Sequence, residues 1–151
     1  YSLPIQTNLP ISAIEKMILA LEGFELVKDP ASDDQTIVGP GLVGVWVLSQ
    51  SEHSKNIKEK SLGFRPDLLL FFRLEKFEKT NAGYVSVLKV TMELLNQGSG
   101  DAALLVDGED IALARNNGRI VVYSQGGLWS FVQPTAVTLP YELNDHELIT
   151  V

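Results

Sequence analysis

The sequence GDAALLVDGEDIALARNNGRIVVYS, residues 100–124, contains two dipeptides that reverse a chain sharply. Asp107–Gly108 and Asn117–Gly118 are each typical of a two-residue hairpin turn, in which both central residues adopt positive φ. Apolar side chains flank both dipeptides, as they do in paired strands with a buried face. The segment therefore predicts a β-meander of three antiparallel strands joined by tight turns.

The register of this meander follows from the length of its turns. Two-residue turns place Val106 opposite Glu109 and Leu104 opposite Ile111 at the first corner, and Leu113 opposite Val122 at the second. Because side chains alternate between the two sides of a sheet, this register gives a thick face and a thin face. The thick face has large aliphatic side chains, suited to packing under helices: Leu104, Val106, Ile111, Leu113, Ile120 and Val122. The thin face is shallower: Ala103, Leu105, Ala112, Ala114, Val121 and Tyr123.

The thin face is apolar, so we expect something to cover it. The tail around Trp129 and Phe131 could do so, or another chain could, either a second copy or a different protein. In the latter case the meander carries a partner surface, made of thin-face residues and of the acids at the first turn. Its predicted members are Ala103, Leu105, Ala112, Ala114 and Tyr123, with Asp107, Glu109 and Asp110.

The acidic first turn, DGED, does not have the spacing of a metal site. A calcium loop needs acids at alternate positions before a glycine and a distal glutamate, whereas Gly108 follows Asp107 directly. The loop PASDDQ, which begins at Pro30, lacks regular ligand spacing as well. We expect these carboxylates to point into solvent, and we predict neither a metal nor another cofactor.

No pattern of residues indicates a catalytic centre. The chain has no cysteine, so a thiol nucleophile is excluded, and no G-x-S-x-G motif is present. His53 and His146 are expected to be exposed and non-catalytic, since neither sits in a recognisable triad pattern. The pieces GPGLVG and SQGGLW lead into strand-like sequence, which favours turns over a phosphate cradle. An enzyme or small-molecule binder whose site joins distant acids remains an alternative.

Composition narrows the kinds of partner. The net charge is −7 and no basic patch is dense, so nucleic acid is not an expected partner. No run of apolar residues is long enough to span a membrane, and no secretory leader is recognisable. Together with the absence of cysteine, this predicts a cytoplasmic protein that binds another protein or itself.

Two long helices and one short helix are expected. The segment SAIEKMILALEGF, residues 12–24, has an apolar stripe at helical spacing, with Ser12 and Glu15 placed as a capping box. The segment TNAGYVSVLKVTMELLNQG, residues 80–98, should form the second long helix, capped by Thr80 or Asn81. A short helix is predicted over residues 51–60, with Ser51 as its cap.

Strands are expected over residues 24–29, 42–49 and 67–74, and residues 30–41 read as a loop. Residues 67–74 are apolar at both alternating positions, which predicts a central strand covered on both faces. The opening decapeptide contains a short extended segment, and LWSFV and AVTLPYEL in the tail are strand-like. The prediction is one α+β domain over residues 1–151: a mixed, mostly antiparallel sheet, two main helices on one face, and a β-meander toward the C-terminus.

Part of this pattern resembles a known family. LGFRPDLLLFFRLEKF, then a helix, then GDAALLVDGEDIALARNNGRIVV with Arg115 before a glycine turn and a later tryptophan, is similar to the small bacterial immunity proteins of swarming-inhibition (Sit-type) toxins. The resemblance covers about residues 62–129, and Asp107 stands where that family is expected to have asparagine. It implies a protein that binds and neutralises a partner protein by steric contact, with no catalytic residue. A secretion-chaperone-like binder is also compatible with an acidic α+β module of this size.

Overall fold

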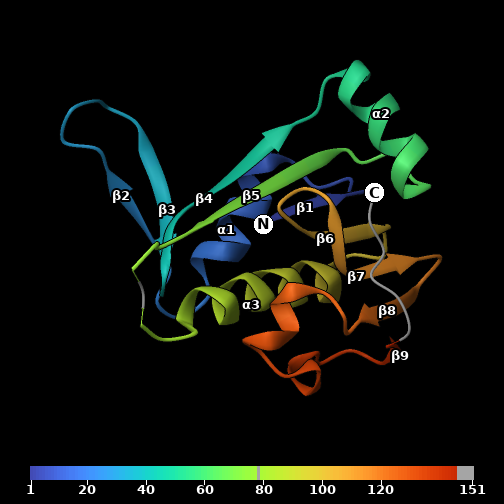
Figure 1. The fold of residues 1–151 in the computed structure, drawn as a ribbon. Helices are drawn as coiled ribbons and strands as arrows, with labels where there is room; N and C mark the ends of the chain where they lie inside the picture. The colour runs from blue at the N-terminus through green and yellow to red at the C-terminus, as the bar shows by residue number, and fades with distance from the viewer. Residues whose placement is uncertain (78, 146–151) are drawn as a thin grey trace.

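The computed structural model describes residues 1–77 and 79–145, which build one sheet of nine strands (Figure 1). The strands are β1 (Ser2–Ile5), β2 (Glu25–Lys28), β3 (Gln35–Gly39), β4 (Leu42–Ser49), β5 (Leu68–Leu74), β6 (Ala102–Val106), β7 (Asp110–Asn116), β8 (Arg119–Tyr123) and β9 (Tyr141–Asn144). Their order across the sheet is β2-β3-β4-β5-β1-β6-β7-β8-β9. All neighbours are antiparallel except β8 and β9, which are parallel. The predicted α+β class and mixed, mostly antiparallel sheet are confirmed.

The short first strand, β1, joins the two halves of the sheet. Ser2 lies opposite Phe71 of β5 on one side and opposite Leu105 of β6 on the other. Leu3 is 0% exposed in the centre of the core. The sequence predicted an extended segment here, and the structure adds that this segment is the central strand of the sheet.

The two main helices cover one face of the sheet, as predicted. They are α1 (Ile11–Leu19) and α3 (Ala82–Gln97), and their buried side chains share one core cluster with the strands below (Figure 1). The capping box predicted for α1 is wrong, because the helix begins before Ser12. The amides of Ala13 and Ile14 both donate to the Pro10 carbonyl, at 3.0 and 3.2 Å, so Ser12 lies within the first turn.

The start of α3 is fixed by close contact with the turn between β3 and β4. A Cβ atom on Gly83 would lie 2.7 Å from the Gly41 carbonyl oxygen, so only glycine fits there. The Ser86 hydroxyl donates to the Pro40 carbonyl at 2.6 Å. The predicted side-chain cap is wrong. Asn81 is the N-cap residue, but its side chain donates to the Phe131 carbonyl and makes no capping bond. The Thr80 hydroxyl accepts a hydrogen bond from the amide of Ala82, the first residue of α3, which is not a capping bond.

The helix α2 (Glu52–Leu62) connects β4 to β5, and its predicted cap is confirmed. The sequence predicts a short helix here, but the 11 residues of α2 make it longer than α1, which has 9. The Ser51 hydroxyl accepts a hydrogen bond from the Ser54 amide at 3.1 Å, and Gly63 ends the helix in the left-handed conformation. Figure 1 shows that α2 lies apart from the pair formed by α1 and α3.

Four predicted elements differ from the structure. The predicted loop at residues 30–41 contains β3, which the surrounding glycines, prolines and acids obscured. LWSFV is not a strand, since Gly127–Ser130 form a 3-10 turn, and within AVTLPYEL only Tyr141–Leu143 belong to a strand. β5 is central but not covered on both faces, because Phe71 is 44% exposed.

We expect Leu3→Ala to lower the free energy of unfolding by about 2–5 kcal/mol, because it leaves a cavity where the two halves of the sheet meet. Leu9→Ala removes the same atoms from a side chain that is more than a third exposed, so its effect should be much smaller. Urea denaturation followed by fluorescence measures both. Equal losses would show that β1 does not join the sheet in this way.

Candidate functional site

The meander that carries the predicted partner surface forms as β6, β7 and β8, and the central residues of both turns have the predicted positive φ. Asp107 and Asn117 have φ of 53° and 51°, and the glycines that follow them are also at positive φ. The predicted pairs across the second turn are confirmed, with Leu113 opposite Val122.

The predicted register across the first turn is wrong. Glu109 remains in the turn, so Val106 lies opposite Asp110, and Leu105 rather than Leu104 lies opposite Ile111. A second shift follows at once, because Leu104 pairs with Leu113 and leaves Ala112 as an extra residue in β7.

The two shifts together restore most of the predicted division into faces. A displacement of two residues preserves the alternation of side chains, so Leu104 and Leu113 still share the main core. Only the bulge region changes sides. Ile111 joins the thin face, and Ala112 joins the main core.

The bulge at Ala112 is held by the tail. The indole nitrogen of Trp129 donates to the Ala112 carbonyl at 3.0 Å, so a carbonyl displaced from the ladder gains a partner. Trp129 belongs to the main core, and Phe131 stacks on Tyr84 of α3 with ring centroids 4.1 Å apart. The tail therefore packs on the thick face, and the prediction that it could cover the thin face is wrong.

The thin face is covered by the segment that ends α2. Phe64 is 4% exposed and packs with Leu62 against the thin-face residues of the meander: Ala103, Leu105, Ile111 and Ala114, with Tyr123 at the edge. Of the residues predicted for a partner surface, Ala103, Leu105, Ala112 and Ala114 are thus buried within the chain itself. They are not exposed to another molecule, because Phe64 and the main core enclose them.

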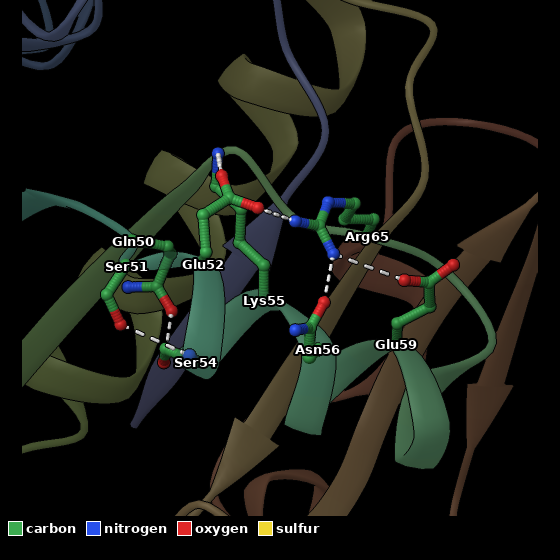
Figure 2. Close-up of polar contacts among 8 residues, drawn as sticks. All are labelled: Gln50, Ser51, Glu52, Ser54, Lys55, Asn56, Glu59 and Arg65. Atoms are coloured by element: carbon green, nitrogen blue, oxygen red, sulfur yellow. Dashed lines mark hydrogen bonds and ion pairs between the residues drawn. The ribbon is translucent and has the colours of Figure 1, made fainter.

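Arg65, next to Phe64, fixes α2 from outside the small core (Figure 2). Its guanidinium donates to Asn56 Oδ1 at 2.6 Å and forms ion pairs with Glu52 and Glu59. All three partners belong to α2. The helix and the phenylalanine that covers the thin face are therefore positioned together.

The acids of the first turn lie at the surface of the meander. Asp107 and Glu109 are exposed and Asp110 is half-buried at the start of β7. Within residues 1–77 and 79–145, no group of three or more His, Asp or Glu side chains is placed to hold a metal ion. His53 is exposed on α2, and His146 lies outside the described residues.

The buried charged side chain in the described part of the chain is Arg115, on β7. Its Nη1 donates to the Leu95 carbonyl at 2.6 Å and its Nε to the Gly100 carbonyl at 2.9 Å. Leu95 lies in the last turn of α3, where carbonyls lack helical partners and a cation is favoured. Burial lowers the pKa of Arg115, and the carboxylate of Asp101 opposes that shift.

The same place ties several elements together, and we call it the Arg115 junction: Arg115, Leu95, Gly100, Asp101 and Gln6. The Gln6 amide, just after β1, donates to the Asp101 carbonyl at 2.8 Å. Arg115 is therefore a structural residue that joins the end of α3 to the sheet, and nothing in its contacts indicates catalysis.

A groove of about 590 Å³ lies between α3 and the tail. Apolar side chains such as Leu88, Met92 and Leu139 form most of its lining, and Lys89 and Glu93 are the ionisable residues there. Neither is buried, and they are four residues apart on one exposed helix surface. The groove thus lacks the pair of buried ionisable groups that an acid–base site would show.

A second surface, which the sequence did not single out, lies on the opposite face of the sheet from α1 and α3. We call it the outer patch and define it as Val27, Trp46, Leu48, Leu69 and Phe71. Trp46 lies opposite Phe71, with ring centroids 6.0 Å apart, and Leu48 lies opposite Leu69. Val27, Leu48 and Phe71 are each exposed by more than a third. Exposed apolar residues gathered on one face are typical of an interaction surface.

These features define a compact α+β protein with an exposed apolar surface. The family model described as SitI3-like matches residues 1–133, and the chain therefore belongs to this family of immunity proteins, which are typically non-catalytic. The match extends the resemblance of residues 62–129 through the N-terminal half. Comparison with the curated proteins and with the solved structures gives no significant match. Among residues 1–77 and 79–145, no helix has both the length and the apolar character needed to cross a bilayer.

We expect Phe64→Ala to lower the free energy of unfolding by about 3–5 kcal/mol, because it removes the ring that fills the small core. Phe77→Ala is the matched control, since Phe77 is 87% exposed and the same change should have almost no effect. Denaturant titration of both variants gives the comparison. If the two variants were equally stable, Phe64 would not be the cover of the thin face.

Arg115→Met should lower the free energy of unfolding by about 2–4 kcal/mol, because two buried carbonyls lose their donors. Arg115→Lys should lose less, since an ammonium can still reach one carbonyl and retains the charge at the end of α3. Thermal and urea unfolding test this order. A methionine variant more stable than the lysine variant would contradict the role given to the junction.

Proposed function

We propose that this chain is a cytoplasmic immunity protein that neutralises a protein toxin by binding it. The observation that carries the proposal is the match of the SitI3-like immunity family to residues 1–133 of the 151-residue chain. Membership of an immunity family implies a toxin as the partner. The cytoplasmic location rests on the composition, with no cysteine and an acidic net charge.

The mechanism we propose is steric. Arg115 is the charged side chain buried in the described part of the chain, and it donates two hydrogen bonds to backbone carbonyls of its own chain. Its contacts therefore indicate a structural role and not a chemical one. The outer patch offers exposed apolar side chains gathered on one face of the sheet, which suits a binding surface. Occupying the toxin's surface is sufficient to block it, because no chemical step is needed once the toxin cannot reach its target.

The test first asks whether a gene beside this chain's gene encodes a polypeptide that kills cells, and then whether this chain protects cells that produce that polypeptide. Cells that also produce this chain should survive, and cells with an empty vector should not. The purified mixture should contain a stoichiometric complex by light scattering. The mass of the toxic polypeptide should be unchanged by mass spectrometry, because steric binding alters no covalent bond.

Two results would contradict the proposal. Cells would die despite full production of the folded chain, or the toxic polypeptide would be cleaved or modified at less than stoichiometric amounts of the chain. The second result would indicate an enzyme that inactivates the toxin.

A further inference from the structure

The sheet ends in a strand that is free along one side. β2 is the last strand beside β3, and in the described residues no strand pairs with its other edge. Figure 1 shows the hairpin of β2 and β3 projecting from the body at the end of the sheet away from β9. We propose that an extended, basic segment of a partner protein adds to the free edge of β2 as a tenth strand. The inference rests on the proposed function and names the surface and the chemistry of the partner.

The backbone of β2 presents hydrogen-bonding groups to that edge. The Asp29 amide donates to the Asp34 carbonyl at 2.9 Å, which makes this a hydrogen-bonded pair of the hairpin. Hydrogen-bonded and non-bonded pairs alternate in an antiparallel ladder, and β2 and β3 keep one register without a bulge. The amide and carbonyl groups of Leu26 and Lys28 therefore point away from β3, toward the free edge.

The side chains of β2 are exposed on both faces of this edge. Leu26 is 45% exposed and Val27 is 42% exposed, and they point to opposite sides of the sheet. Val27 lies opposite Thr36. The side chains of Thr36 and Trp46 both lie next to Gly44, because a Cβ atom on this glycine would contact each of them. The outer patch therefore runs from Phe71 to the edge, and an added strand would continue it with its own apolar side chains.

The charge of the hairpin specifies the kind of strand. Residues 25–34 contain one basic residue, Lys28, and four acidic residues: Glu25, Asp29, Asp33 and Asp34. Their net charge is −3, whereas the net charge of the whole chain is −7. Asp33 has a fully exposed side chain whose ion-pair partner is Lys28. A segment with Lys or Arg beside its apolar residues matches this hairpin in charge and is steered toward it.

A second copy of this chain fits the edge less well. Two copies joined through β2 would bring together two hairpins that each carry the same net negative charge. Like charges across neighbouring strands destabilise pairing, whereas opposite charges support it. The chemistry of the hairpin thus favours a basic partner over self-association.

The decisive experiment compares Leu26→Pro with Leu26→Ala in binding to the toxic polypeptide that the protection test of the proposed function identifies. Both variants lose the leucine side chain, but only proline removes the amide that points to the free edge. The β2–β3 ladder does not use that amide, so both variants should fold, which circular dichroism checks. We expect the proline variant to bind at least about tenfold more weakly than the alanine variant by calorimetry.

A second pair of variants tests the charge and remains informative if the proline variant fails to fold. Asp33→Asn with Asp34→Asn should weaken binding and reduce its dependence on salt, because part of the attraction to a basic segment is removed. Asp107→Asn is the matched control on the meander, since asparagine is accepted at that turn and the site is on another part of the sheet. It should bind like the wild type.

Several results would overturn the inference. Equal binding by the proline and alanine variants would exclude strand addition at β2 while leaving the proposed function intact. Loss of binding with Asp107→Asn, but not with the Asp33 and Asp34 changes, would place the partner on the meander. A wild-type dimer in light scattering that Leu26→Pro dissociates would make a second copy the occupant. Absence of any binding by the wild type would overturn the proposed function as well.

Discussion

One guanidinium group connects the central helix of this protein to its sheet. Arg115 donates hydrogen bonds to the carbonyls of Leu95 and Gly100. It thereby provides a donor to the last turn of α3, where carbonyls have no partner within the helix. A buried charge is costly, yet here it meets the negative end of a helix and the nearby carboxylate of Asp101. The position of α3 determines where the core lies on the sheet. The tail contacts α3 where Phe131 stacks on Tyr84, and it contacts the bulge of β7 where Trp129 donates to the Ala112 carbonyl.

Local rules in the sequence predicted several parts of the fold that depend on neighbouring residues, although they failed for the capping box of α1 and for the register across the first turn. Asp107 and Asn117 adopt positive φ because each precedes a glycine in a tight turn, and Ser51 caps its helix across three residues. The bulge at Ala112 could not be predicted this way, because its carbonyl is satisfied by a tryptophan that lies elsewhere in the chain. The same holds for the cover of the thin face. Phe64 leaves no signal in its own neighbourhood that it will pack on Ala103 and Leu105.

The predicted partner surface illustrates how a mostly correct division into faces can include residues that the chain itself buries. The thin face does need a cover, and its own chain supplies one through Phe64, which Arg65 and α2 support. Exposed apolar area lies instead on the other half of the sheet, around Phe71 and Leu48. The sequence of residues 68–74 does not reveal this exposed area, because residue type alone does not distinguish an exposed phenylalanine from a buried one. The packing of Phe64 on the meander leaves the other half of the sheet as the part whose apolar side chains are exposed.

The central position of β1 has a consequence for the synthesis of the protein. β1 is the first of the nine strands to leave the ribosome, but its neighbours β5 and β6 end at Leu74 and Val106. At a translation rate of roughly 5–20 residues per second, β1 waits several seconds before both partners exist. During that interval Leu3 and Ile5 have no core to enter. The sheet therefore cannot close around Leu3 and Ile5 until residues as far along the chain as Val106 have been made.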